Sequence, residues 1–228
     1  MKLIRHLPNA LTCGNLLCGC LGIVFCLEGR SIPVAYFVWA AGVFDFLDGF
    51  AARWLKAASP IGKELDSLAD MVSFGLLPSL VMYKMIAFTS GNPYLPFAAF
   101  LIAVCSALRL AIFNVDETQS DSFKGLNTPA NTFFITALPF LTGSLGTFIQ
   151  QDWVLILITI IFSLLLVSRM EIIAFKFKDF SWTNNKVRFT FLACTVLLLV
   201  ILGKIALPLI ILIYIAFSLV AKWMKLNG

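Results

Sequence analysis

Four aspartates at spacings of three and four residues are the side chains of this sequence best suited to chemistry. Asp45 and Asp48 lie three residues apart, and Asp66 and Asp70 lie four apart. On a helix, side chains at these spacings share one face. A short connection at 56–62 would make the two helices antiparallel neighbours, so the four carboxylates could converge. The spacing therefore predicts an acidic cluster built from two adjacent helices.

Such a cluster needs compensating positive charge, because it lies in strongly apolar sequence. Each aspartate placed in a membrane costs about 2.5–3.5 kcal/mol on insertion scales. Arg53 supplies one cation, and bound divalent ions would supply the rest. Oxygen ligands without histidine or thiolate favour Mg²⁺ or Mn²⁺. Two such ions could clamp the attacking and leaving oxygens of a phosphoryl displacement.

Small residues accompany the aspartates at Gly49, Ala52 and Gly62. They would allow a nucleotide or a neighbouring helix to approach the backbone closely. Helix packing alone also explains them. For the aspartates themselves, the rival function is an ion or proton transporter, where acidic side chains also face inward. A transporter would be expected to repeat its charges in two related halves, and here the acidic cluster occurs once.

Composition places these residues in a membrane protein. Of 228 residues, 60% are hydrophobic and 13% are charged, and the mean hydropathy is +0.94. A soluble domain would carry roughly 25% charged residues. We therefore predict an all-α polytopic bundle, a single domain over 1–228, with the motif at 45–70 and a C-terminal helical hairpin at 187–223. About eight transmembrane helices are expected near 10–28, 32–55, 66–88, 95–115, 130–149, 153–175, 187–202 and 205–223.

The distribution of basic residues predicts the orientation. An even number of spans places both termini on one side of the membrane. Nearly all of the 17 Lys and Arg residues fall on that side, and only Arg30, Lys84 and Lys204 fall on the other. By the positive-inside rule, the termini and the acidic cluster should face the cytoplasm, in a multi-pass protein of the plasma membrane. A nucleic-acid partner has no support, because the cations are spread over loops; anionic membrane lipids suit the net charge of +5.

The segment from Asp45 to Asp70 has the pattern D-x2-D-G-x2-A-R-x8-G-x3-D-x3-D. This pattern resembles the signature of the CDP-alcohol phosphotransferase family, whose members join an alcohol to a phosphatidyl or related group and release CMP. The resemblance implies that the aspartates hold two divalent ions, Mg²⁺ or Mn²⁺, and that Asp70 is also the general base. The metal ligands would be Asp45, Asp48, Asp66 and Asp70, and the CDP site would include Gly49, Ala52, Arg53 and Gly62.

Further segments are similar to the phosphatidylserine synthase branch of that family. These are Pro8–Asn15, in which Thr12 and Asn15 could reach the diphosphate, and the stretches 70–78, 108–114 and 123–130. Ile112 and Asn127 depart from this pattern, at positions where a basic residue and a proline are common. The resemblance implies CDP-diacylglycerol and L-serine as substrates, phosphatidylserine and CMP as products, and it allows a homodimer.

Arg109 lies deep in an apolar span, where an unpaired guanidinium is costly. It could neutralise the acidic cluster, or it could grip the serine carboxylate as a planar, bidentate fork. Asn114 and Lys124 could assist in acceptor binding, although a solvated loop lysine also explains Lys124. Glycerol 3-phosphate, inositol phosphate and choline are the alternative acceptors. A phosphorylated acceptor would require a cluster of cations, whereas Arg109 suits a single carboxylate.

Overall fold

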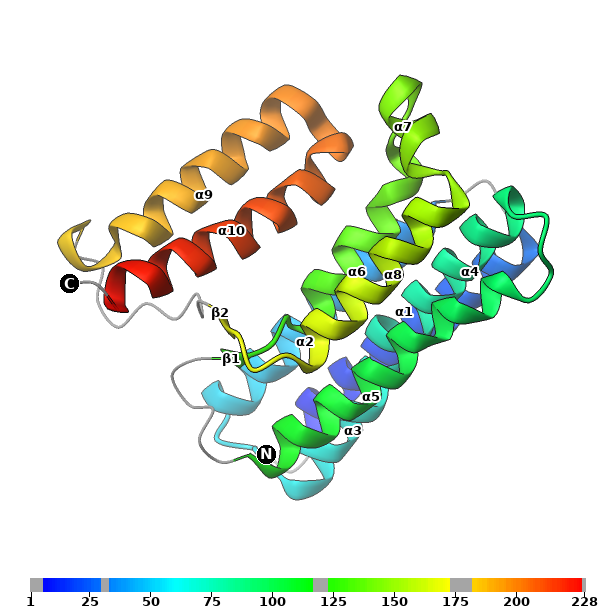
Figure 1. Ribbon diagram of the computed structural model, residues 1–228. Helices are drawn as coiled ribbons and strands as arrows, with labels where there is room; N and C mark the ends of the chain where they lie inside the picture. Colours follow the sequence, from blue (N-terminus) through cyan, green and yellow to red (C-terminus); the bar gives the residue numbers. More distant parts are fainter. Residues whose placement is uncertain (1–5, 30–32, 117–122, 173–181, 227–228) are drawn as a thin grey trace.

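The computed structural model describes residues 6–29, 33–116, 123–172 and 182–226. These residues form a bundle of helices (Figure 1), as the sequence predicts. The only strands in this part of the chain are β1 (Phe123–Lys124) and β2 (Glu171–Ile172), which pair antiparallel. The prediction of an all-helical architecture is therefore correct apart from this short pair.

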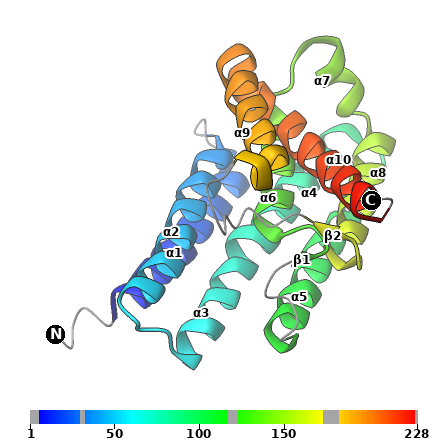
Figure 2. The same ribbon diagram turned by 90° about the vertical axis from the view of Figure 1, so that its left-hand side faces the viewer.

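The first half of the chain carries the acidic motif on long helices. These are α1 (Leu7–Glu28), α2 (Val34–Trp54), α3 (Pro60–Asp70), a π-helix η2 (Met71–Leu76) and α4 (Leu77–Thr89). Helix α1 packs against α2 along its length and also against α3 and η2, and Figure 2 shows α1 and α2 side by side. A Cβ at Gly19 of α1 would overlap the Ser73 side chain, so glycine permits this close approach.

The second half surrounds this group. It comprises η3 (Leu95–Ala99), α5 (Phe100–Val115), α6 (Thr128–Ala137), η4 (Leu138–Phe140), α7 (Gly143–Ile149) and α8 (Asp152–Val167). Helix α5 packs against both η2 and α8, and α6 packs against α2, α4, η2 and α10. The buried core lies between these helices and includes Phe74, Leu77, Met82, Ile102 and Ile135.

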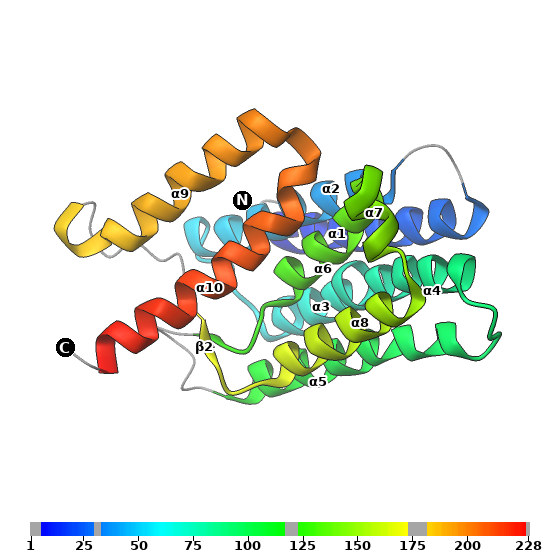
Figure 3. The same ribbon diagram turned by 45° about the horizontal axis from the view of Figure 1, so that its top comes forward.

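The chain ends in α9 (Trp182–Leu202), a 3-10 turn η5 (Gly203–Ile205) and α10 (Ala206–Leu226). Figure 3 shows α9 and α10 running antiparallel, with α10 between α9 and the rest of the bundle. Gly203 adopts a left-handed conformation with φ 55°, which glycine tolerates without strain. Many large apolar side chains of α9 are exposed, including Val200 and Ile201, as expected for a surface that faces lipid.

The described helices identify an integral membrane protein. Five helical segments are long and apolar enough to cross a bilayer, or up to six if the bent pair α7 and α8, which meet at 71°, counts as one span. The predicted number of about eight spans is not confirmed. The difference is clearest at the span expected over 130–149, because α6 ends at Ala137 after 10 residues. At 1.5 Å per residue, α6 covers about 15 Å, roughly half of the apolar thickness of a bilayer.

Specific residues at the helix starts explain two of the boundaries that position the site. The Ser59 hydroxyl accepts a hydrogen bond from the Gly62 amide at 3.0 Å and caps α3, whose first residue is Pro60. The Asn127 side chain accepts one from the Ala130 amide at 2.8 Å and caps α6. Asn127, the departure from the expected proline, is therefore a helix cap.

Candidate active site

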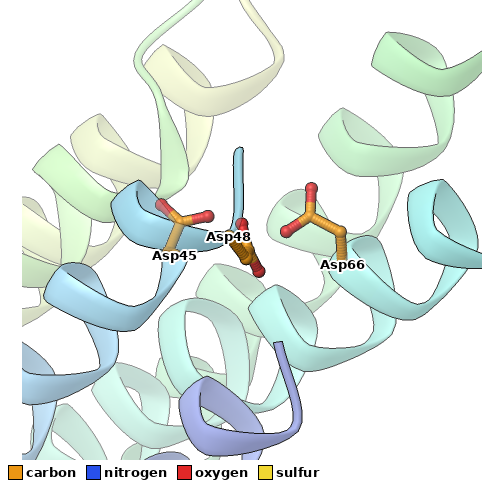
Figure 4. A group of neighbouring side chains, drawn as sticks. All are labelled: Asp45, Asp48 and Asp66. Atoms are coloured by element: carbon orange, nitrogen blue, oxygen red, sulfur yellow. The ribbon is translucent and has the colours of Figure 1, made fainter. Parts of the chain in front are cut away.

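The acidic residues come together where α2 and α3 face each other. One carboxylate oxygen from each of Asp45, Asp48 and Asp66 lies within 4.8 Å of the others, and Figure 4 shows the three side chains converging from the two helices. Asp70 lies one turn after Asp66 on α3 and interacts electrostatically with all three carboxylates. Asp48 and Asp70 are buried, and Asp45 and Asp66 are half-buried.

Helix α1 supplies the hydrogen bonds that hold two of these carboxylates. The Thr12 hydroxyl donates to Asp48 Oδ2 at 2.6 Å, and the Asn15 amide nitrogen donates to Asp70 Oδ1 at 3.0 Å. Thr12 and Asn15 are three residues apart, so they face the acidic cluster from the same side of α1. Their predicted contact with a diphosphate stays a prediction; in the structure they orient carboxylates.

The donor set fits divalent cations. Its members are all carboxylate oxygens, the class of ligand that Mg²⁺ and Mn²⁺ prefer. Asp66 Oδ1 is buried and has no hydrogen-bond partner among the described residues, so it is available as a ligand. Three negative groups within 4.8 Å also repel one another unless a cation lies between them. Asp45, Asp48, Asp66 and Asp70 are the residues that would hold such ions.

A pocket of about 180 Å³ opens beside the cluster, between α1, α2 and the start of α3. Of the predicted CDP-binding residues, Thr12, Gly49, Ala52 and Gly62 line it, together with Asp48 and Asp66. A Cβ at Gly49 would meet no atom within 4 Å, so the backbone there is open to the pocket. The remaining lining residues are Pro8, Asn9, Ala57, Ala58, Ser59 and Lys63.

Two predicted CDP-binding residues do not line this pocket. Asn15 lies one turn deeper along α1 than Thr12, where it contacts Asp70. Arg53 is exposed near the end of α2, one residue beyond Ala52 and therefore rotated by about 100° from it. The cation that lines the pocket is Lys63, which the sequence interpretation counted only as a cytoplasmic charge.

Arg109 reaches the site from α5. It is 8% exposed, interacts electrostatically with Asp70 and also with Tyr214 of α10. Its Nε has no hydrogen-bond partner among the described residues. Arg109 is thus a buried cation next to the fourth aspartate, a position compatible with both predicted roles.

The other two predicted acceptor residues are not brought to Arg109 by the described contacts. Asn114 donates from Nδ2 to the Ser67 hydroxyl at 2.8 Å, and its backbone oxygen accepts from Lys63 Nζ at 2.8 Å. Asn114 follows Arg109 by five positions, about 140° of rotation, so they occupy different faces of α5. Asn114 therefore ties α5 to α3. Lys124 belongs to β1, and its side chain lies outside the described part of the structure.

Comparison with known proteins decides the family. Residues 5–167 match the CDP-alcohol phosphatidyltransferase family. The chain belongs to that family. The prediction made from the Asp45–Asp70 pattern is confirmed, and the matched region of this phosphatidyltransferase domain contains the acidic cluster, Arg109 and α1 to α8.

Several curated relatives of this phosphatidyltransferase carry the name CDP-diacylglycerol–serine O-phosphatidyltransferase. The protein of Bacillus subtilis is 36% identical over 141 residues, which cover 60% of this chain and 77% of the relative. The protein of Mycobacterium leprae is 34% identical over 175 residues, 73% of this chain and 58% of the relative. The protein of Saccharomyces cerevisiae is 32% identical over 151 residues, 59% of this chain and 54% of the relative. The chain thus spans little more than half the length of the latter two.

Proposed function

We propose that the protein transfers the phosphatidyl group of CDP-diacylglycerol to the hydroxyl of L-serine, giving phosphatidylserine and CMP. The observation that carries the proposal is the position of Asp70. It interacts electrostatically both with a carboxylate cluster suited to divalent ions and with a buried arginine suited to a carboxylate. The names of the relatives in Bacillus, Mycobacterium and yeast support the same donor and acceptor.

Asp70 is the proposed general base. A serine hydroxyl is a weak nucleophile until its proton is removed. Asp70 accepts that proton, while the Asn15 amide keeps its Oδ1 in place. The serine oxygen then bonds to the phosphorus nearest the diacylglycerol, and the bond from that phosphorus to the CMP oxygen breaks. Divalent ions held by the aspartates would stabilise the negative charge of the diphosphate and of departing CMP.

The pocket beside the cluster is the proposed nucleotide site. Gly49, Ala52 and Gly62 leave room for the cytidine diphosphate against the backbone, and Lys63 is the cation on its wall. Thr12 would act by fixing Asp48. Arg53 and Asn15, which do not line the pocket, would reach the nucleotide only if it extends beyond these walls.

The proposed acceptor site contains Arg109, whose guanidinium would hold the serine carboxylate in a bidentate pair. Among the described residues Arg109 is the only buried cation. A phosphorylated acceptor such as glycerol 3-phosphate or inositol phosphate would require more positive charge, so serine is favoured. Asn114 could assist Arg109 only if it moved from its present position. Assistance by Lys124 remains a proposal.

The proposed setting is the plasma membrane, with the active site and both termini in the cytoplasm, where serine enters and CMP leaves. The starts of α1 and α3 and the end of α5 lie at one end of the bundle (Figure 1), and the nucleotide pocket is at that end.

We also propose that the domain covers 1–228 as one unit, with α9 and α10 as its C-terminal hairpin, and that it can form a homodimer.

The decisive experiment measures CMP release from CDP-diacylglycerol by the purified protein. Serine, glycerol 3-phosphate, inositol phosphate and choline are offered separately, with Mg²⁺ or Mn²⁺ present. We expect CMP release with serine and formation of phosphatidylserine in equal amount. Release with another acceptor alone would replace serine in the proposal, and no release with any acceptor would contradict phosphatidyl transfer.

A further inference from the structure

A set of buried polar groups on α5 and α6 lacks partners within the described protein. The side chain of Asn131 is 0% exposed, and neither its Oδ1 nor its Nδ2 has a hydrogen-bond partner there. The same holds for the hydroxyls of Thr128 and Ser106 and for Nε of Arg109. Buried polar groups are nearly always hydrogen-bonded, because an unmet donor or acceptor loses its hydration without compensation. An amide with both ends unmet is therefore available to bind a ligand.

The contacts of neighbouring residues fix the direction in which Asn131 points. The Thr132 hydroxyl donates to the Phe74 carbonyl of η2 at 2.8 Å, and the Phe134 ring stacks on Phe162 of α8 at 4.0 Å between centroids. On a helix, Thr132 is rotated by about 100° from Asn131 in one sense, and Phe134 by about 60° in the other. Asn131 therefore points between η2 and α8, and α5 packs against both of these elements. Asn131 faces α5.

The contact between Thr132 and Phe74 also fixes the depth of α6 relative to the continuous helix formed by α3 and η2. The Thr132 hydroxyl meets the Phe74 carbonyl, and α6 and the α3–η2 helix both begin at the end of the bundle that holds the nucleotide pocket. Thr128 precedes Thr132 by four residues, and Asp70 precedes Phe74 by four. Both therefore lie about 6 Å nearer that end. Thr128 is thus level with the proposed base, and Asn131 lies less than one turn deeper.

The depth of α5 is fixed in a similar way. A Cβ at Gly75 of η2 would lie 3.2 Å from Ser106 Cβ, so these two residues are in contact across the helices. Arg109 lies three residues after Ser106, about 4.5 Å nearer the nucleotide end, and interacts electrostatically with Asp70. Arg109, Thr128 and Asn131 are consequently within about one helical turn of Asp70 in depth, on two helices that both pack against η2.

We propose that Asn131, together with Thr128, recognises the ammonium group of the acceptor serine. This inference rests on the proposed function and extends its acceptor site onto α6. An ammonium group has three donors and no acceptor, so it requires oxygen atoms around it. Asn131 Oδ1 and Thr128 Oγ1 are neutral acceptors, which can lie near Arg109 without pairing with it as a carboxylate would. Arg109 then holds the carboxylate, and Asp70 is left for the hydroxyl.

The test compares Asn131→Leu and Asn131→Ala with the wild-type protein in detergent. Each variant removes the oxygen, and the smaller one serves if leucine does not fit the site. We expect the KM for serine to rise by about 10- to 100-fold, with the KM for CDP-diacylglycerol unchanged. The melting temperature without substrate should be equal or higher for Asn131→Leu, because an unmet polar group has been replaced by an apolar one of similar shape.

Two analogues of serine test recognition of its ammonium group and of its carboxylate separately. Ethanolamine keeps the ammonium and lacks the carboxylate, whereas 3-hydroxypropionate keeps the carboxylate and lacks the ammonium. As competitors of serine, ethanolamine should bind more weakly to both variants, and 3-hydroxypropionate should bind as it does to the wild type. Equal losses for the two analogues would overturn the assignment to the ammonium group.

Thr136→Val is the matched control. Thr136 is a buried polar residue of the same helix, its hydroxyl donates to the Thr132 carbonyl, and it lies farther from the level of Asp70. Its KM values should match those of the wild type. An unchanged serine KM in both Asn131 variants would overturn the inference, as would a lower melting temperature with both substrates equally impaired. If the wild-type protein itself does not use serine, the proposed function fails instead.

Discussion

The amide of Asn15 on α1 donates a hydrogen bond to Asp70 Oδ1, across 55 residues of sequence, and this contact fixes the orientation of the proposed base. A carboxylate that must accept a proton from a bound alcohol has to present its other oxygen in a defined direction. Helix α1 therefore contributes to the proposed chemistry although its acidic residue, Glu28, lies at its far end.

Removal of this amide should impair turnover more than substrate binding. For Asn15→Ala we expect kcat to fall by about tenfold to a hundredfold, since hydrogen bonds to charged groups contribute about 1.5–3 kcal/mol. The KM for serine should change little. Steady-state CMP release with each substrate varied in turn gives both constants. A serine KM that rises while kcat is kept would instead place Asn15 in the acceptor site.

The carboxylates should be required for turnover and for metal dependence. Asp48→Asn, Asp66→Asn and Asp70→Asn should each reduce CMP release by orders of magnitude while the protein still inserts into the membrane. Each change removes a charged oxygen ligand or the base. EDTA should abolish wild-type activity, and Mg²⁺ or Mn²⁺ should restore it. Full activity in EDTA would exclude a divalent-metal mechanism.

A substitution at Arg109 distinguishes its two predicted roles, because each role predicts a different effect on the KM values of the two substrates. Arg109→Lys keeps the charge and loses the planar fork, a change that is not conservative at a bidentate site. We expect the serine KM to rise about tenfold to a hundredfold, with little effect on the KM for CDP-diacylglycerol. If Arg109 only neutralises the aspartates, both constants should worsen together, with a weaker response to Mg²⁺.

The orientation can be tested with single cysteines in a variant from which the six native cysteines have been removed. Asn92→Cys and Gln151→Cys lie in turns at the end of the bundle away from the nucleotide pocket, and Ala58→Cys lies in the wall of that pocket. A thiol reagent that cannot cross the membrane, added to intact cells, should label positions 92 and 151 and spare position 58. Labelling of position 58 from outside would reverse the proposed orientation.

The sequence was informative wherever side-chain identity alone decides the structure. The aspartate and glycine pattern led to the family, and long apolar runs led to helices in a membrane. The break after Ala137 was not predicted, because Pro139 and Gly143 lie in an apolar run whose composition suits a continuous span. Hydropathy measures transfer into lipid and carries little information about where backbone geometry interrupts a helix.

The candidate site also has features that the sequence predicts and features that it does not. The spacing of Asp45 and Asp48 places both on one face, and this geometry depends only on the helical repeat. The hydrogen bonds of Thr12 and Asn15 to carboxylates depend instead on how α1 lies across α2 and α3, which is tertiary information. Lys63 and Asn131 were missed for different reasons. A lysine between two predicted spans resembles any other basic residue outside the membrane, whereas an asparagine inside an apolar span was a visible signal that could have been followed.

The π-helix between Asp70 and Leu77 sets the helical phase of α4, which continues directly from it. A π turn carries one more residue than an α turn, so the face of α4 is shifted by about 100° relative to a continuous α-helix. The segment before it turns Asp66 and Asp70 toward the other carboxylates, and the segment after it turns Leu77 and Met82 into the core. Deleting one residue from 71–76 would put these two requirements out of phase. The molecule would then have to give up either its acidic centre or its packing along α4.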